Sequence, residues 1–460
     1  MSHSTRRTFL RTAATHGAML GGGFGILGRL PPVRADEAKP DPDRVRLTPD
    51  TESLVRLIET TQRERLIEEV STRIRNGTSY RELLTGLLLA GVRNIQPRPA
   101  VGFKFHAVLV VNSAHLASLA APDTDRWLPL FWALDNFKSS QATNAKEGGW
   151  YMKPVDEGKV PSPAKAVAEF TAAMDTWDVP RADTAAAGIA RTLTPHQAFE
   201  LFVKYGARDF RDIGHKAIFV ANSFRTLQTI GWHHAEPVLR SLAYALLKYD
   251  GDNPSTSDAA PDRPGRRNRE LAARPVAADG TVNGGATTEL VAALRTGSDS
   301  EVADRFVEAL VRGTASPGDA WDAMYLGAGE LLLRQPGIVA LHAMTTTNAL
   351  HYAYETVTDE ATRRWLMLQN ASFVTLFRDA LKGRGKVGDT HIDELAAEPV
   401  KGGVEELFAT ASTDKLSAAK KALGYLSSGG DARLVTDVAR HLVFSRHRLS
   451  RRLASSAQPC

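Results

Sequence analysis

The sequence predicts an all-α protein, a large array of helical hairpin-like units packed around a central site lined by histidines. Apolar residues recur at helical spacing in one segment after another. No stretch alternates apolar and polar residues between hairpin turns, as β-strands would. Three related segments each place a histidine among apolar residues, and these segments predict the central site.

The first helix signal covers residues 51–75, where apolar side chains recur every three or four positions until Asn76-Gly77 ends the pattern. Ser79 and Glu82 form a capping box ahead of the apolar run 83–92. Later helices open with a proline in the first turn or with a capping residue. Helices are expected over residues 106–121, 126–138, 162–174, 194–205, 215–231, 316–334, 338–354, 358–381, 417–426 and 432–453, and from residue 237 onward.

The amino-acid composition predicts that the chain is divided into two helical halves. Residues 251–286 are rich in Pro, Ser and Gly, which predicts a flexible crossover or linker. An N-terminal half would cover residues 36–250 and a C-terminal half residues 287–460. We expect these halves to pack as one domain.

Charge and cysteine content limit the function. The formal net charge of +5 comes from five arginines in residues 1–35, and the rest of the chain holds 52 basic and 52 acidic side chains. A neutral body gives no reason to expect nucleic-acid binding. The only cysteine is Cys460, so any metal must be held by histidine and oxygen ligands. Beyond the N-terminus, no apolar run is long enough for a membrane span.

The N-terminus has the features of an export signal. Thr5-Arg6-Arg7-Thr8-Phe9-Leu10 resembles a twin-arginine motif, and a mildly apolar run follows from Ala13 to Leu27. Val33-Arg34-Ala35 offers the small residues that a signal peptidase reads. We therefore expect a signal peptide over residues 1–35. The twin-arginine export machinery would carry the protein, folded in the cytoplasm, to the periplasm or the cell exterior.

The strongest motif is a repeated histidine pattern. In the segments that begin at His106 and His342, Ala follows the histidine, Asn lies six residues after it, and a second His lies nine after it. A looser copy begins at His215, with Asn222 one position late and Arg225 in place of the last histidine. Nine residues make two and a half helical turns, so one helix can offer its first or its second histidine to a common site, but not both.

The first histidine occurs in all three copies, so His106, His215 and His342 are the expected metal ligands. His234, in the turn after the His215 helix, is a fourth candidate. Asn112, Asn222, Asn348 and Asp212 are candidates for orienting the imidazoles or for bridging helices. For any single histidine, a hydrogen bond to an Asn or a carbonyl of a neighbouring helix is the favoured explanation, whereas three histidines on related helices favour a shared site. Neutral imidazole suits iron, copper and zinc alike.

The segment Gly337–Thr345, the following Ala349-Leu350 and a tryptophan-bearing helix over 361–376 together resemble the questin oxidase-like family. This resemblance implies an all-helical oxygenase, and His106 and His215 fall on helices that could match the family's earlier histidine-bearing helices. Some members of that family hold non-haem iron with several histidines and a carbamylated lysine, for which Lys138, Lys216 and Lys382 are candidates here. Fungal members act on polyketide anthraquinones.

The leading hypothesis is an exported oxidoreductase, a non-haem iron oxygenase that uses O2 on a small apolar or aromatic substrate. Phe105, Phe219, Trp232 and Met344 would line the substrate pocket. One alternative is a non-enzymatic helical binding or scaffold protein whose His–Asn pairs are structural. Another is a non-covalent bis-histidine haem protein, since no haem attachment motif is present. The sequence assigns no catalytic acid, base or nucleophile, and no oligomeric state.

Overall fold

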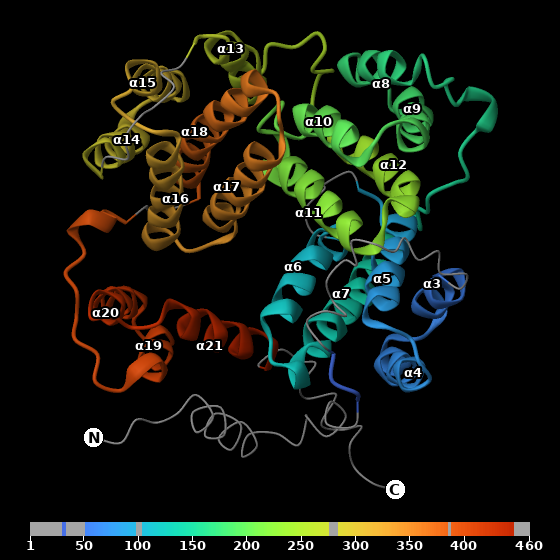
Figure 1. The fold of residues 1–460 in the computed structure, drawn as a ribbon, viewed down its shortest axis with the longest axis horizontal. Helices are drawn as coiled ribbons and strands as arrows, with labels where there is room; N and C mark the ends of the chain where they lie inside the picture. The colour runs from blue at the N-terminus through green and yellow to red at the C-terminus, as the bar shows by residue number, and fades with distance from the viewer. Residues whose placement is uncertain (1–29, 34–50, 98–103, 276–283, 385–387, 446–460) are drawn as a thin grey trace, which may run out of the picture. The chain divides into compact units, whose positions relative to one another are not determined.

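The computed structural model describes residues 30–33, 51–97, 104–275, 284–384 and 388–445. In these residues it contains the helices α3 to α21, short 3-10 turns and no β-strand, which confirms the all-α prediction (Figure 1). No helix in these ranges is both long and apolar enough to cross a bilayer. The expected signal peptide lies outside the described residues except for residues 30–33, and it stays a prediction.

The chain forms two compact units. Unit 1 comprises Met1–Gly91, Val110–Thr143 and Ala396–Cys460, and unit 2 comprises Val92–Leu109 and Asn144–Leu395. The segment 251–286 and the helices on both sides of it belong to unit 2.

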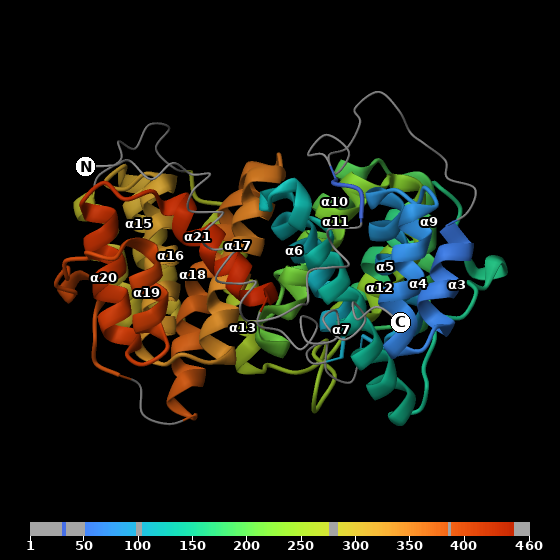
Figure 2. The same cartoon turned by 90° about the horizontal axis from the view of Figure 1, so that it is seen from below.

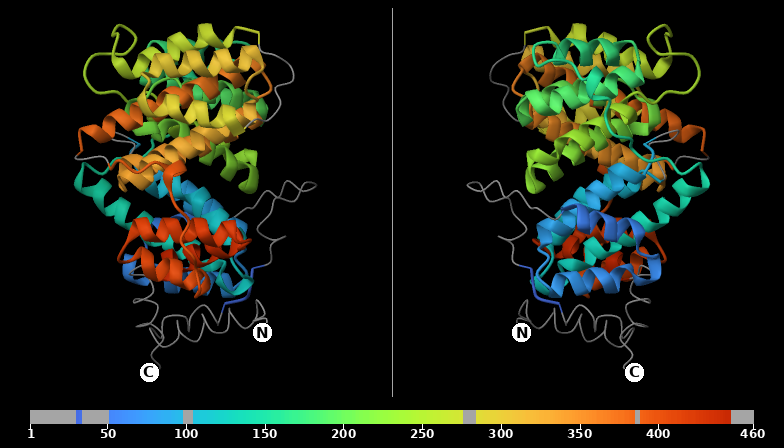
Figure 3. Two further views of the ribbon diagram at one scale, coloured as in Figure 1. Left: turned by 90° about the vertical axis from the view of Figure 1, so that its left-hand side faces the viewer. Right: turned by 90° about the vertical axis from the view of Figure 1, so that its right-hand side faces the viewer.

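Unit 1 is built from N-terminal and C-terminal helices. Its elements are α3 (Thr51–Thr60), α4 (Arg63–Arg75), most of α5 (Tyr80–Asn94), the later part of α6 (His106–Ala120), most of α7 (Trp127–Lys146), α19 (Gly403–Ala411), α20 (Lys415–Ser427) and α21 (Ala432–Ser445). The predicted capping box starts α5, since the Glu82 carboxylate accepts from the Ser79 amide at 2.7 Å. At the other end of the chain, α19 packs beside α20 and α21 (Figure 3).

Residues 30–33 are fixed against the start of α7. The Arg126 guanidinium donates to the Val33 carbonyl at 2.8 Å, and the Trp127 indole N–H donates to the Pro31 carbonyl at 2.9 Å. Leu30 and Val33 are both buried, with Val33 only 1% exposed. This short segment is therefore an integral part of the packing of unit 1.

His115, the second histidine of the first copy, is buried in the core of unit 1. Its Nδ1 shares a hydrogen bond of 3.0 Å with the Tyr80 hydroxyl, and the side chain is 4% exposed. Burial penalises the charged imidazole and lowers the pKa of His115 to about 4.

This shift predicts a loss of stability in acid. The unfolded chain, with a histidine pKa of about 6.5, binds more protons than the folded one between pH 6.5 and pH 4. Through His115, the free energy of unfolding should therefore fall by about 1.4 kcal/mol for each unit by which the pH decreases over that window. Urea unfolding of wild type and His115→Gln at several pH values measures this slope, which should be shallower in the variant. Equal slopes would show that His115 is not held neutral.

Unit 2 contains the first turn of α6 and eleven complete helices. These are α8 (Ala166–Asp175), α9 (Val179–Thr192), α10 (Pro195–Gly206), α11 (His215–Ile230), α12 (Ala235–Leu246), α13 (Arg263–Ala272), α14 (Gly284–Thr296), α15 (Asp299–Arg312), α16 (Pro317–Arg334), α17 (Ile338–Thr356) and α18 (Glu360–Lys382). Capping boxes at Thr194–Gln197 and Ser316–Asp319 start α10 and α16.

The helices α16, α17 and α18 form the centre of one side of unit 2 (Figure 2). Helix α18 is buried along most of its length because α13, α15 and α17 all pack on it. Helix α11 packs on α17, and α10 packs on α11. This arrangement brings the start of α11 beside α17, which is where two of the expected metal ligands lie.

Two expectations about helices are corrected. The single helix expected over 51–75 is interrupted between α3 and α4, because the chain bends at residues 61–62 while both helices keep their apolar faces buried. The flexible linker expected over 251–286 contains the helix α13. Its composition is polar, but Pro264, Gly265 and Asn268 are buried, and the Asn268 amide donates to the Gln369 side chain at 2.8 Å.

Candidate metal centre

The backbone before His215 adopts a rare conformation. Asp212 and Ile213 have φ values of 59° and 47°, and Gly214 follows with φ of 81°. Left-handed backbone is strained for most residues and most of all for a β-branched one such as Ile213. Three such residues in a row turn the chain sharply before α11, and strain of this kind is typical of functional sites.

This left-handed turn fixes the imidazole of His215. The Asp212 carbonyl accepts a hydrogen bond from His215 Nδ1 at 2.7 Å, while the Asp212 carboxylate lies 3.9 Å from the same nitrogen. Asp212 therefore orients the ring, as expected, but mainly through its main chain. The opposite nitrogen, Nε2, is directed toward α17.

His342 is held in the same way on α17. Its Nδ1 donates to the Ile338 carbonyl one helical turn earlier, at 2.6 Å, and its Nε2 faces His215 Nε2 at 2.8 Å. His215 and His342 are 3% and 4% exposed. Both rings therefore commit Nδ1 to a backbone carbonyl and direct Nε2 to one shared point.

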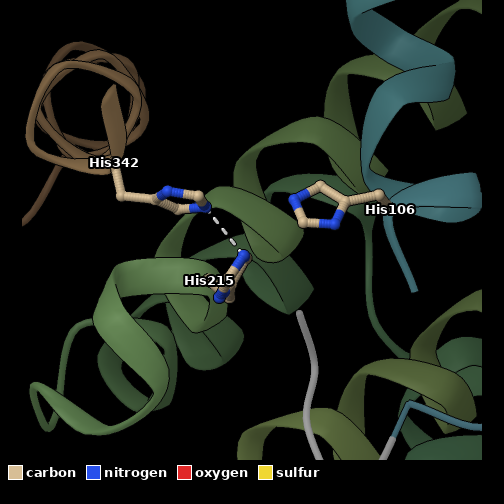
Figure 4. Close-up of side chains that lie close together, drawn as sticks. All are labelled: His106, His215 and His342. Atoms are coloured by element: carbon tan, nitrogen blue, oxygen red, sulfur yellow. Dashed lines mark hydrogen bonds between the residues drawn. The ribbon is translucent and has the colours of Figure 1, made fainter. Parts of the chain in front are cut away.

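His106 completes the group from the first turn of α6. Its ring centroid lies 5.2 Å from that of His215 and 6.0 Å from that of His342. One ligand nitrogen from each of the three rings can be chosen so that all lie within 4.8 Å of one another. The three imidazoles converge from α6, α11 and α17, as Figure 4 shows. All three belong to unit 2.

The short contacts around His215 and His342 require more hydrogens than the rings carry. Three contacts are made, two to carbonyl oxygens and one between the two Nε2 atoms. Two neutral imidazoles have only two N–H groups, and a carbonyl can only accept. If both N–H groups point to the carbonyls, two lone pairs face each other at 2.8 Å. A positive ion shared by both rings removes this conflict.

A third proton is a poor candidate for that ion. Burial, followed by the repulsion of His342, lowers the pKa of His215 to about 3, and burial also lowers the pKa of His342. Desolvation disfavours an imidazolium here because the charge would leave water, and the Asp212 carboxylate stays 3.9 Å from His215 Nδ1. Both rings are accordingly neutral near pH 7, the form in which histidine binds metals.

Residues of the repeated motif join the three histidine helices. The Asn222 amide donates to the Leu109 carbonyl of α6 at 2.9 Å, and Arg225 donates to the Asn348 side chain of α17 at 3.0 Å. Helix α11 is thus bonded to both neighbours. Asn222 and Asn348 have the bridging role that the sequence left open, and Asn112 is buried on α6.

Other sequence candidates lie elsewhere. His234 is not in the three-histidine group, and its ring packs on His233 with centroids 3.9 Å apart. The second histidine of the last copy, His351, bonds the Tyr325 hydroxyl at 3.2 Å. Phe105 and Phe219 pack edge to face at 4.5 Å in the core beside His106 and His215.

None of the three lysine candidates has a metal-binding arrangement in the described residues. The Lys216 ammonium bonds the Asp209 carboxylate at 2.7 Å, and Lys138 donates to the Glu59 carbonyl at 3.0 Å. Lys382 pairs with Asp379 at the surface.

Two further features of the site could not be predicted directly from the sequence. One is the left-handed turn, for which Gly214 before His215 was the only available signal. The other is Thr346, one helical turn after His342, which is fully buried and whose hydroxyl has no hydrogen-bond partner among the described residues. Thr346 packs against Gly214, so the two features meet beside the histidines.

This contact predicts a strong effect of a single methyl group. A Cβ at Gly214 would lie 2.0 Å from Thr346 Oγ1, and φ of 81° strains any other residue. Gly214→Ala should lower the free energy of unfolding by about 2–3 kcal/mol. Gly251 is the matched control, since its φ of 79° is similar but a Cβ there meets nothing within 4 Å. Gly251→Ala should cost only about 1 kcal/mol. Equal losses in urea unfolding would exclude the clash.

Comparison of the chain with protein-family models, with curated proteins and with solved structures found no match. The site therefore has to be interpreted from its own geometry.

Proposed function

We propose that His106, His215 and His342 bind one divalent transition-metal ion and that the protein is a metal-dependent oxidoreductase. One observation carries this proposal. The buried Nε2 atoms of His215 and His342 lie 2.8 Å apart while both Nδ1 atoms are held by carbonyls. Metal-binding histidines commonly donate the other ring N–H to a carbonyl in this way.

The spacing of the rings suits a metal ion. With metal–nitrogen bonds of about 2.05 Å, two ligand nitrogens lie about 2.9 Å apart at a 90° angle and about 3.3 Å apart in a tetrahedron. The observed 2.8 Å between the Nε2 atoms of His215 and His342 matches the first value closely. The chosen nitrogen of His106 has to approach by up to about 1.5 Å, which rotation of its half-buried side chain can supply.

The ligand chemistry limits the identity of the metal to a few transition metals but does not select one. Three neutral imidazoles leave the full charge on a divalent ion and suit iron, copper and zinc. Three protein ligands also leave positions open for small molecules, as catalytic sites require. The resemblance to questin oxidase-like oxygenases favours iron. Bound iron would supply the ability to bind and reduce O2.

The chain itself would control access to this ion. Phe105 and Phe219 close the core beside the ligands, and the left-handed turn and Ile338 hold two rings in place. These apolar surroundings exclude water and favour a small apolar or aromatic organic substrate. We further propose export by the twin-arginine route to the periplasm or the cell exterior, because that route carries proteins already folded around a cofactor.

A structural role for the cluster is the second candidate, and the same short contact supports it. A proton shared between His215 and His342 would also bridge the two Nε2 atoms. In that case the protein would be a helical binding or scaffold protein. A bis-histidine haem is a weaker candidate, because a 2.8 Å separation leaves no room for haem iron between the rings, whose bonds to each would be about 2 Å long.

Metal analysis of the purified protein, combined with an absorption spectrum, tests the proposal. We expect about one equivalent of iron, no Soret band and O2 consumption with a reducing aromatic substrate. Stoichiometric zinc without O2 consumption would support the metal site but overturn the oxygenase. A Soret band would indicate haem. No retained metal, and no binding of added Fe²⁺, Zn²⁺ or Co²⁺, would overturn the metal centre.

A further inference from the structure

A cavity of about 380 Å³ lies in unit 2 and is lined in part by Asp212 of the left-handed turn. Its size is within the range of about 300–1,000 Å³ typical of small-molecule sites. The cavity combines apolar walls with charged groups of both signs. It is lined by Phe210, Arg211, Asp212, Lys248, Tyr249, Asp250, Ala260, Pro261 and Leu376.

The positive side is rigid. Arg211 uses Nε and Nη2 to bind both oxygens of Asp262, at 2.9 and 2.7 Å. This fork fixes the guanidinium and leaves Nη1 with a longer bond of 3.3 Å to the Asp250 carbonyl. Lys248, whose side chain is 9% exposed, adds an ammonium from the end of α12. A fixed guanidinium with donor capacity left over is well suited to a carboxylate.

The negative side is adaptable. Asp250 pairs with Lys248, but its carboxylate is 89% exposed. Because the Asp250 carboxylate is exposed to solvent, a ligand group can take its place beside Lys248. Asp212 also lines the cavity, and its carboxylate lies 3.9 Å from His215 Nδ1. An ammonium group entering the cavity would therefore meet acidic groups within reach of the basic ones.

The remaining walls are apolar. Phe210 and Tyr249 present aromatic rings, and Pro261 and Leu376 present aliphatic surface. Phe210 is held in place, since its amide donates to the Pro261 carbonyl at 2.9 Å and its ring packs edge to face on Phe377 at 4.7 Å. These surfaces would bury an apolar side chain. A simple inorganic ion or a sugar has no apolar group to place against them.

We propose that this cavity binds a small zwitterion with an apolar side chain, of the class of the hydrophobic α-amino acids. The ligand's carboxylate meets Arg211 and Lys248, its ammonium meets Asp250 and Asp212, and its side chain packs on Phe210, Tyr249 and Leu376. Equal numbers of basic and acidic lining residues match a ligand with no net charge. The cavity shares only Asp212 with the histidine site, so the proposal does not depend on a bound metal.

The test uses three probes that differ only in charge. L-phenylalanine carries both groups, 3-phenylpropionate lacks the ammonium, and phenethylamine lacks the carboxylate. In calorimetric titrations of the full chain, we expect L-phenylalanine to bind at least about tenfold more tightly than either analogue. Equal binding of 3-phenylpropionate or of phenethylamine would overturn the zwitterion assignment, and so would no binding of L-phenylalanine or L-leucine at millimolar concentration.

Two variants locate the probe. Lys248→Met keeps most of the apolar stem but removes the ammonium, and it should weaken L-phenylalanine about tenfold while leaving phenethylamine unchanged. Asp250→Asn should weaken the binding of L-phenylalanine to a similar extent and leave the binding of 3-phenylpropionate unchanged. Lys382→Met is the control, because it breaks an exposed Lys–Asp pair that lies outside the cavity. Equal effects of Lys248→Met and Lys382→Met would place the binding elsewhere and overturn the proposal.

Discussion

Replacing His215 or His342 by alanine is expected to reduce bound metal from about one equivalent to less than about a tenth. Each replacement removes one of the two nitrogens that face each other at 2.8 Å and leaves at most two ligands. Replacing His106, the outermost ligand of the three, should weaken binding less. Elemental analysis after dialysis against a weak chelator measures the effect, and circular dichroism confirms that the variants are folded.

His351→Ala is the control for this experiment. His351 lies nine residues after His342 on the same helix, but it bonds Tyr325 and does not belong to the three-histidine group. This variant should lose some stability and keep its metal. If His351→Ala lost metal as completely as His342→Ala, the assigned ligand set would be wrong. If neither His215→Ala nor His342→Ala lost metal, the centre itself would be wrong.

Asp209→Asn is expected to destabilise the protein by about 3–5 kcal/mol, because it leaves a buried charge without its partner. Lys216 is completely buried, and its ammonium contacts both oxygens of Asp209 at 2.7 and 3.0 Å. Burial lowers the pKa of Lys216 to about 8, so the lysine is mostly charged at pH 7. Because Lys216 follows His215 directly, its loss of order would also disturb the left-handed turn. Urea unfolding at pH 7 measures the change.

A double variant separates the charge from the shape of this pair. Asp209→Asn combined with Lys216→Met removes the unpaired ammonium and should recover much of the lost stability. Lys382→Met breaks an exposed pair with Asp379 and should change stability by no more than about 0.5 kcal/mol. A double variant as unstable as Asp209→Asn alone would mean that Asp209 acts through its other partners instead, the Arg211 amide at 3.1 Å and the Arg208 guanidinium at 3.5 Å.

Much of the fold could be predicted because the local signals are strong. The capping boxes at Ser79, Thr194 and Ser316 each start a helix at the expected place. Prolines in the first turn marked α10 and α16 in the same way. The boundaries that failed depend on tertiary packing. The polar helix α13 is stable because α18 buries one face of it, and its own composition resembles that of a loop.

The site was predicted only as far as repetition could identify it. His106, His215 and His342 share a pattern, and the pattern implies equivalent helices, so their convergence could be inferred. His234 has no counterpart in the other copies, and the structure places it with His233. The turn at Asp212 and Ile213 could not be predicted, because left-handed backbone at these residue types opposes their own preferences and exists only through its surroundings.

The packing of residues 30–33 bears on the proposed removal of a signal peptide. A peptidase that cut after Ala35 would release the carbonyls that now accept from Arg126 and Trp127, together with the buried Val33 side chain. The guanidinium and the indole N–H would then need new acceptors, and the apolar surface of α7 that Val33 covers would be exposed. The uncleaved chain would then be more stable than the cleaved one. The cleaved chain would expose a site beside α7 where another peptide segment could bind.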